Sequence, residues 1–162
     1  MGGSQCYIAA PNGAVMCVDD ASHGRLRGRL YHAYSREAIE ICSVDELTFE
    51  LERFYDALQF PYPSNSDRTF LPDKHKATPK QERTRVMENE KLLKQHGDMG
   101  TFIIHVQHRQ NSSWQGRITW ADKNRSVQFR SIWEMIKLIA EALDTVSTQE
   151  GTASEATWEE DI

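Results

Sequence analysis

The sequence predicts an α+β protein in which a strand–strand–strand–helix unit occurs twice. In two separate parts of the chain, short runs that alternate apolar and polar residues are followed by a segment with helical periodicity. The chain has 162 residues, of which 39% are hydrophobic, so it can bury a core. One such unit cannot cover both its sheet and its helix. We therefore expect two antiparallel sheets whose helices pack in a pseudo-twofold arrangement.

The first unit is expected over residues 1–58 and begins with a hairpin. Its turn is Asn12-Gly13, a dipeptide that readily adopts the positive φ angles of a type I′ turn. A helix follows from Ser43, because apolar residues then recur at spacings of three and four and because Ser43 with Glu46 forms a capping box. The strands of this unit are expected near 5–10 and 14–19, and within 25–34 and 37–42.

A connector is expected over residues 59–99. Its first part, 59–79, contains four prolines and many small polar residues, which favour turns and irregular structure. Its second part has few apolar positions and predicts an exposed helix over 80–95 that stops at Gly97.

The second unit is expected over residues 100–146, with a helix over 131–143 that begins with a second capping box, Ser131 and Glu134. The residues after it, 147–162, are rich in Thr, Ser and Glu and predict a disordered acidic tail. Strands are expected within 100–109, 112–121 and 125–130.

The two units can be superimposed in sequence without a gap. Val18 falls on Val106 and Gly28 on Gly116, and both pairs differ by 88 residues. Six of the 39 positions from 13 to 51 are identical at this offset, and the apolar pattern agrees more widely. This agreement predicts an internal duplication.

Charge is distributed unevenly along the chain. The net charge is −5, and the residues from Ser147 onward carry five acidic and no basic side chains, so the remainder is neutral. Between Thr101 and Arg130, five Lys and Arg residues stand beside one Asp. The chain has no apolar run long enough to cross a membrane and no signal-peptide pattern, so we expect a cytoplasmic protein without a membrane partner.

Residues with catalytic or metal-binding potential are scattered. His105 and His108 are three apart, and on a strand such residues point to opposite faces. The three cysteines form no C-x-x-C pair, and we expect them to be reduced. No phosphate-binding loop or nucleophile elbow is present. We therefore expect neither an enzyme nor a cofactor.

The sheet face that points away from the helices is expected to be basic. In the second strand of each unit, Leu26 and Leu30, and likewise Trp114, Ile118 and Trp120, should point towards the helices, although the two tryptophans would also suit base stacking. The opposite face then carries guanidinium and amide groups, which suit phosphates and unpaired bases. The same pattern also keeps a solvent-facing sheet soluble. The predicted binding residues are Arg25, Arg27, Arg29, Tyr31, Arg109, Arg117 and Arg130.

The second unit carries the pattern V-x-x-x-x-N-x-x-x-G-R followed by an apolar residue, with Val106, Asn111, Gly116, Arg117 and Ile118 at the defined positions. Together with the duplicated strands and capped helices, this resembles the PUR-repeat proteins and, more loosely, the Whirly proteins. The resemblance implies binding of single-stranded DNA or RNA on the sheets. The run SWQGRITW with FRSIWEMIKLI is also similar to small uncharacterised bacterial proteins, and that similarity implies no function.

Two functions follow as expectations. In the first, the basic face binds single-stranded nucleic acid, and the acidic tail competes for the same surface. In the second, the protein is a regulatory adaptor or scaffold that binds a protein partner through a sheet edge or through the acidic tail with Trp158. The sequence leaves the choice between DNA and RNA open, and it is also compatible with a homodimer.

Overall fold

The computed structural model describes residues 8, 10–71 and 83–159, with side chains described as far as Thr148. It has a mixed α+β fold, as predicted. The strands are β1 (Ala14–Asp20), β2 (Arg27–His32), β3 (Ile39–Ile41), β4 (Gly100–Gln110), β5 (Ser113–Trp120) and β6 (Arg125–Phe129). Among the described residues the helices are α2 (Val44–Leu58), α3 (Asn89–Leu93) and α4 (Ile132–Glu159), with short 3₁₀ turns at Ser22–Gly24 and Ala121–Lys123.

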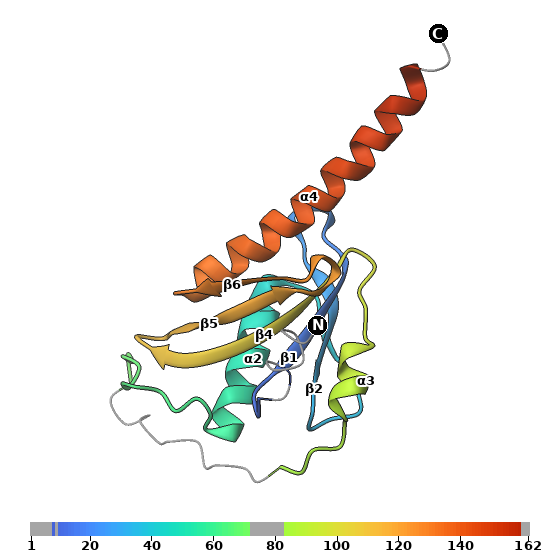
Figure 1. Cartoon of the computed structure of the whole chain (residues 1–162). Helices are drawn as coiled ribbons and strands as arrows, with labels where there is room; N and C mark the ends of the chain where they lie inside the picture. The colour runs from blue at the N-terminus through green and yellow to red at the C-terminus, as the bar shows by residue number, and fades with distance from the viewer. Residues whose placement is uncertain (1–7, 9, 72–82, 160–162) are drawn as a thin grey trace.

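The strands form one six-stranded antiparallel sheet in the order β3-β2-β1-β4-β5-β6, visible in Figure 1. The expectation of two sheets was wrong. β1 and β4 pair with each other from Ala14↔Ile104 to Val18↔Gly100, so backbone hydrogen bonds join the two halves. This pairing gives both strands a neighbour on each side and avoids two extra sheet edges with unpaired backbone groups.

Strand pairing in the two halves follows the same register at an offset of 88 residues. Val18 lies opposite Gly28, and Val106 lies opposite Gly116; 106 minus 18 and 116 minus 28 both give 88. A β-bulge follows each of these pairs, at Asp19 in the first half and at Gln107 in the second. Both central strands are therefore bent at the corresponding place.

Two helices, α2 and α4, cover one face of the sheet (Figure 1). Their apolar residues pack with alternate residues of the strands, including Leu30 and Ile118. Each helix begins as predicted, since the backbone N–H of Glu46 donates to Ser43 Oγ and that of Glu134 donates to Ser131 Oγ, both at 3.1 Å.

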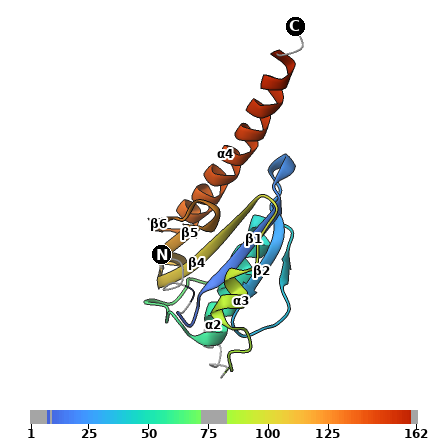
Figure 2. The same ribbon diagram turned by 45° about the vertical axis from the view of Figure 1, so that its right-hand side comes forward.

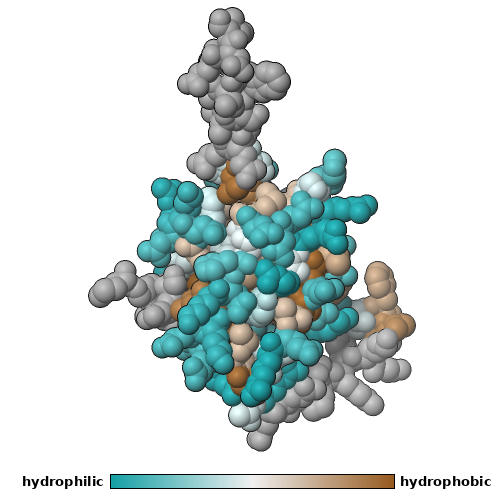
Figure 3. Space-filling model, turned by 90° about the vertical axis from the view of Figure 1, so that its right-hand side faces the viewer, coloured by the Kyte–Doolittle hydropathy of each residue, from teal (hydrophilic) through white to brown (hydrophobic). Residues whose placement is uncertain are grey.

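On the other face of the sheet, the described residues form a cover mainly over the first half. Val15, Cys17 and Tyr31 pack there with Met87 and Leu92 in a second apolar cluster. Figure 2 shows α3 lying against β1 and β2. The helix predicted over 80–95 is thus only five residues long, and its segment is anchored by two buried side chains. The outer surface on this side, seen in Figure 3, is mostly hydrophilic with small hydrophobic areas between the polar side chains.

Three predicted features lie at the ends of the chain or partly outside the described residues. Of the strand expected over 5–10, the structure describes only Ile8, which is helical, and Ala10, which lies in a bend, so neither is in a strand. The helix α4 continues to Glu159, past Ser147, where the composition predicts disorder, and it extends beyond the sheet (Figure 1). Of the cysteines, Cys17 is buried and Cys42 is exposed, and both are free thiols, whereas Cys6 is outside the described residues.

Candidate functional site

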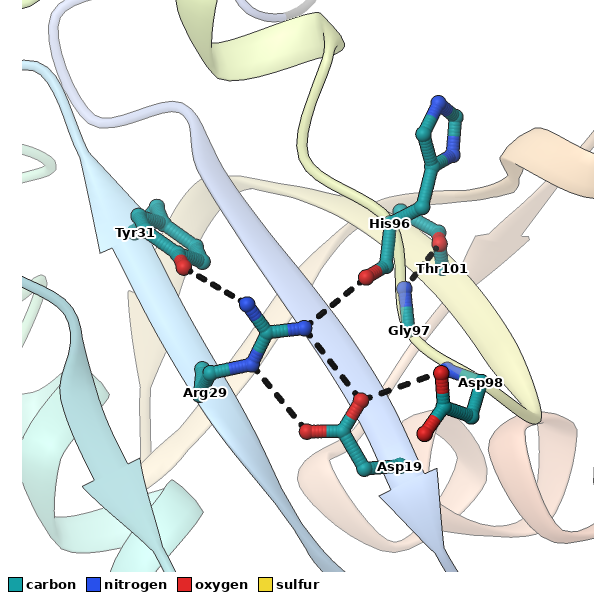
Figure 4. A network of polar contacts seen from close by, with 7 residues as sticks. All are labelled: Asp19, Arg29, Tyr31, His96, Gly97, Asp98 and Thr101. Carbon is teal, nitrogen blue, oxygen red and sulfur yellow. Dashed lines mark hydrogen bonds and ion pairs between the residues drawn. The ribbon is translucent and has the colours of Figure 1, made fainter.

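The seven residues predicted to bind nucleic acid do not form one surface. Arg29 and Tyr31 lie on the helix-free face as predicted, and Figure 4 shows them together. Arg29 forms a two-pronged ion pair with Asp19, with Nε donating to Oδ2 at 3.0 Å and Nη2 to Oδ1 at 3.2 Å. Its remaining donors reach Tyr31 Oη at 2.8 Å and the carbonyl oxygen of His96 at 2.8 Å. The positive charge of Arg29 is therefore already compensated.

The network around Arg29 has a structural role, because it fastens the connector to the sheet. The backbone N–H of Asp98 donates to Asp19 Oδ1 at 3.2 Å, and that of Gly97 donates to Thr101 Oγ1 at 3.0 Å (Figure 4). A Cβ on Gly97 would come within 2.4 Å of the backbone nitrogen of Val18, so only glycine fits there. The hydrogen bond from Arg29 lowers the pKa of the Asp19 carboxyl.

Tyr31 is not available for base stacking. Its side chain belongs to the second apolar cluster and is only 9% exposed. The same cluster contains Met87 and Leu92 of the covering segment and the fully buried Ile8. The short apolar pattern of the covering segment gave no sign in the sequence that it would pack on the sheet.

Arg109 lies on the opposite face from the one predicted. The bulge at Gln107 adds one residue to β4, so the alternation of the strand reverses after it and Arg109 pairs with Trp114 on the helix side. There Arg109 is 4% exposed, and its guanidinium contacts Glu52 and Asp56 of α2. Burial raises the pKa of Glu52, which the hydrogen bond from Trp114 and the charge of Arg109 partly offset.

Three other predicted arginines are exposed but are spread over the surface. Arg27 begins β2 opposite Asp20, and Arg25 lies at the same end of the sheet beside α4. Arg130 precedes α4 and forms an ion pair with Glu134 at 3.0 Å. Its position is explained by the capping box and not by the sheet face.

Arg117 remains on the helix-free face of the second half. It is half-buried and lies between His105 of β4 and Gln128 of β6. Burial, followed by the nearby charge of Arg117, lowers the pKa of His105. Gln107 and Gln128 are exposed on the same half, and Gln115 is half-buried.

The two tryptophans of β5 point towards the helices, as expected for core residues. Trp114 is fully buried in the main core, and Trp120 is partly buried and packs against this core. Trp158, predicted as a docking residue, lies in the part of α4 after Thr148, where the structure describes the backbone alone.

A groove opens at one edge of the sheet, between β6 and α4. β6 is an edge strand, so one side of its backbone has no neighbouring strand among the described residues. The groove has a volume of about 240 Å³. It is lined by apolar groups from both elements, and Val127 in its wall is 48% exposed. The apolar lining consists of Phe102, Ile118, Trp120, Val127, Leu138 and Ala142.

The sequence predicts a sheet edge as a docking surface but does not indicate which edge carries a groove. The sequence signal is the single valine between polar residues in RSVQF, which is typical of a strand that is largely open to solvent.

Comparison of the chain with protein-family models, with curated proteins and with solved structures gave no match. Within the described residues, no three His, Cys, Asp or Glu side chains are grouped so that they could hold a metal ion. None of the helices in the described ranges combines the length and hydrophobicity needed to cross a bilayer.

Proposed function

We propose that this protein is a non-enzymatic adaptor that binds an extended segment of a partner protein along the open edge of β6. The observation that carries this proposal is the apolar groove beside that edge. An added strand gains main-chain hydrogen bonds, and alternate side chains of the added strand enter adjacent pockets. Val127 faces the groove because it pairs with Ile118, a residue of the helix-side core.

The same helix that lines the groove carries an exposed aromatic side chain. Trp133 in the first turn of α4 is 63% exposed, and Lys137, next to the groove residue Leu138 in the sequence, lies 5.2 Å from the centre of its ring. Large exposed aromatic side chains are enriched in protein interfaces. The rim also offers both charges, Arg125 and Glu141, so a partner segment can be oriented by its own charges.

A random peptide library displayed on phage, selected against the intact protein, tests this function. Selected peptides should perturb the backbone amide signals of β6 in NMR spectra. Val127→Glu should weaken their binding about tenfold or more, since it places a charge in an apolar groove. The matched control is Gln128→Glu, which introduces the same charge on the next exposed residue but on the other face of the strand. Peptides that bind both variants equally well, or a selection that yields no binder, would contradict the proposal.

A second candidate function is the binding of single-stranded nucleic acid, DNA or RNA, on the helix-free face of the second half. It is supported by Arg117 with the surrounding glutamines, in a region that the second apolar cluster does not cover. Phosphate contacts from such a surface carry little base information. Arg117→Ala should therefore weaken binding to labelled oligo-dT and oligo-U similarly, whereas Arg53→Ala, at an exposed position of α2, should not.

The acidic residues after Ser147 sharpen that second test. Their removal should strengthen binding to the oligonucleotides by deleting five negative charges, and the gain should shrink as salt is raised. If neither the full chain nor the shortened one binds at roughly 50 mM salt, nucleic-acid binding is excluded as the function.

We also propose that the two strand–strand–strand–helix units arose by internal duplication. It is supported by the offset of 88 residues, which holds for strand register, bulges and capping boxes. A relationship to PUR-repeat proteins remains a proposal that rests on the short motif from Val106 to Ile118. Superposition of residues 13–51 on 101–139 tests the duplication, because Arg29 and Arg117 should then coincide.

A further inference from the structure

A cleft of about 460 Å³ lies between α2, the segment from Tyr62 to Thr69, and the turn between β4 and β5. It shares no lining residue with the β6–α4 groove. Two buried side chains, Arg109 and Trp114, are among its lining residues. The cleft is therefore a second site, separate from the proposed adaptor surface.

The polar groups at the base of the cleft are held in fixed positions. Arg109 donates from Nη1 to Glu52 Oε1 at 3.1 Å and to Asp56 Oδ1 at 2.6 Å, and from Nε to the carbonyl oxygen of Pro61 at 2.8 Å. Trp114 Nε1 donates to Glu52 Oε2 at 2.6 Å. Because the two donors are buried and anchored, the carboxylates of α2 are held in place before any ligand arrives.

The segment that forms the outer wall of the cleft is also anchored. The backbone N–H of Ser64 donates to the carbonyl oxygen of Arg109 at 2.8 Å, and Asn65 exchanges hydrogen bonds with Asn111. Ser112 Oγ donates to Asp67 Oδ1 at 2.6 Å. This brings a third carboxylate to the cleft.

The cleft thus has an excess of negative charge and of hydrogen-bond acceptors. Among the described residues, three carboxylates, those of Glu52, Asp56 and Asp67, line it together with one guanidinium, that of Arg109. The second carboxylate oxygens of Asp56 and Asp67 accept no hydrogen bond from residues in the described ranges. A ligand that complements the cleft must bring positive charge and N–H donors.

We propose that this cleft binds an organic cation, a guanidinium or a primary ammonium group. Such a group can donate to the carboxylates of Asp56 and Asp67. Tyr62, which is 68% exposed and lines the same cleft, offers an aromatic face to the cation or to its methylene chain. The cation is either a side chain of a protein segment or a free polyamine, because both carry the same chemistry.

Titration calorimetry and NMR on the intact protein test this proposal with three probes. They are N-acetyl-arginine amide, its neutral citrulline analogue of nearly the same shape, and spermidine. We expect at least one cation to bind with perturbation of the cleft signals, and we expect the citrulline analogue to bind about tenfold more weakly than the arginine probe or not at all. Binding of the arginine probe without spermidine identifies a protein side chain as the ligand, whereas binding of spermidine alone identifies a free polyamine. The proposal is overturned if neither cation binds at low salt or if citrulline binds as well as arginine.

A charge-neutralising pair of variants locates the site. Asp67→Asn removes a carboxylate of the outer wall and should weaken cation binding about threefold to fivefold at low salt. Glu50→Gln is the control, since it removes one charge from α2 at a residue that pairs with Arg53 and does not line the cleft. Unchanged cation binding by the Asp67→Asn protein, with an unchanged melting temperature, would overturn the assignment to this cleft. Failure here leaves the β6 adaptor test unaffected, because the two sites share no lining residue.

Discussion

The two halves of the sheet have the same strand pairing but different surfaces. In both, the central strand has a bulge one residue after the pair with a glycine, and the helix begins with the same capping box. On the helix-free side, however, β1 and β2 are covered by the segment that carries Met87 and Leu92. The corresponding part of the second half carries polar side chains instead. The residues that determine strand register are therefore different from the residues that determine which side chains the helix-free face exposes.

The bulge residues illustrate this difference. Asp19 and Gln107 occupy equivalent places, since 107 minus 19 is 88, and each follows a strand residue that pairs with a glycine. Asp19 neutralises Arg29, whereas the residue beside Arg117 in the second half is an uncharged amide. One substitution at an equivalent position therefore changes the charge of the face without changing the fold.

The largest effects should come from the two glycines that set the register. A Cβ on Gly28 would lie 2.0 Å from the carbonyl oxygen of Cys17, and one on Gly116 would lie 2.2 Å from that of His105. Gly28→Val and Gly116→Val should each lower the free energy of unfolding by about 2–4 kcal/mol, because the strands must separate locally. Urea denaturation measures both.

Gly100→Ala is the control for these variants, since its nearest contact would be the ring of Phe102 at 3.3 Å, and it should cost less than about 1 kcal/mol. A large difference between the Gly28 and Gly116 variants would break the equivalence of the two halves.

A somewhat smaller effect is expected at Arg109, which has no charged counterpart in the first half. The equivalent residue there is Ala21, since 109 minus 88 is 21. Arg109→Leu should destabilise the protein by about 2 kcal/mol, because Glu52 and Asp56 lose a buried partner but are still partly reached by water. Arg53→Leu, at an exposed ion pair, should change stability by less than about 0.5 kcal/mol. Equal effects in thermal or urea unfolding would contradict the anchoring role of Arg109.

Much of this fold could be predicted from local sequence signals. The six described strands, the two long helices and both capping boxes follow from periodicity and from short-range hydrogen bonding. The union of the halves into one sheet could not be predicted, because the choice between pairing β1 with β4 and packing two sheets depends on long-range contacts that leave no periodic pattern. The same holds for the short α3 segment, which packs on the sheet through a few apolar side chains, Met87, Leu92 and the partly buried Leu93.

The candidate site was less predictable than the fold. A single bulge at Gln107 reversed the face of Arg109, since an extra residue changes the alternation of every position after it. The ion pair between Asp19 and Arg29 joins two strands, and the carboxylates of the cleft come from α2 and from the segment after it. Such clusters arise from tertiary contacts, and their members are ordinary polar residues in the sequence.

The two halves also differ in a buried titratable side chain. His32 is buried, is stacked on Phe54 and accepts a hydrogen bond from the backbone N–H of Tyr34 at Nδ1, whereas the equivalent residue of the second half is Trp120. Burial lowers the pKa of His32 from 6.5 to about 4. The neutral form therefore stabilises the folded state fully above pH 6.5, and this stability is lost as the pH falls from 6.5 towards 4.

Replacing His32 with Phe should remove this part of the pH dependence. Between pH 7 and pH 4.5 the wild-type protein should lose about 2 kcal/mol more stability than the His32→Phe protein, when both are followed by urea denaturation. Carboxylates contribute equally to both proteins and cancel in the difference. Identical pH profiles of the two proteins would show that protonation of His32 does not lower the free energy of unfolding, and would contradict this prediction.

The smallest expected effect separates the two bulge residues. The Asp19–Arg29 pair is about one-third exposed on each side, so a double-mutant cycle with Asp19→Asn and Arg29→Gln should give a coupling of about 0.5–1 kcal/mol that decreases at high salt. Because Asp19 also accepts from the backbone N–H of Asp98, Asp19→Asn should increase amide hydrogen exchange in residues 96–98. The matched change Gln107→Asn alters the equivalent bulge without removing a charge and should leave exchange in that segment unchanged. If both substitutions increase amide hydrogen exchange of residues 96–98 equally, the bulge geometry and not the ion pair holds the connector. The difference in charge between Asp19 and Gln107 would then have no structural consequence for the connector.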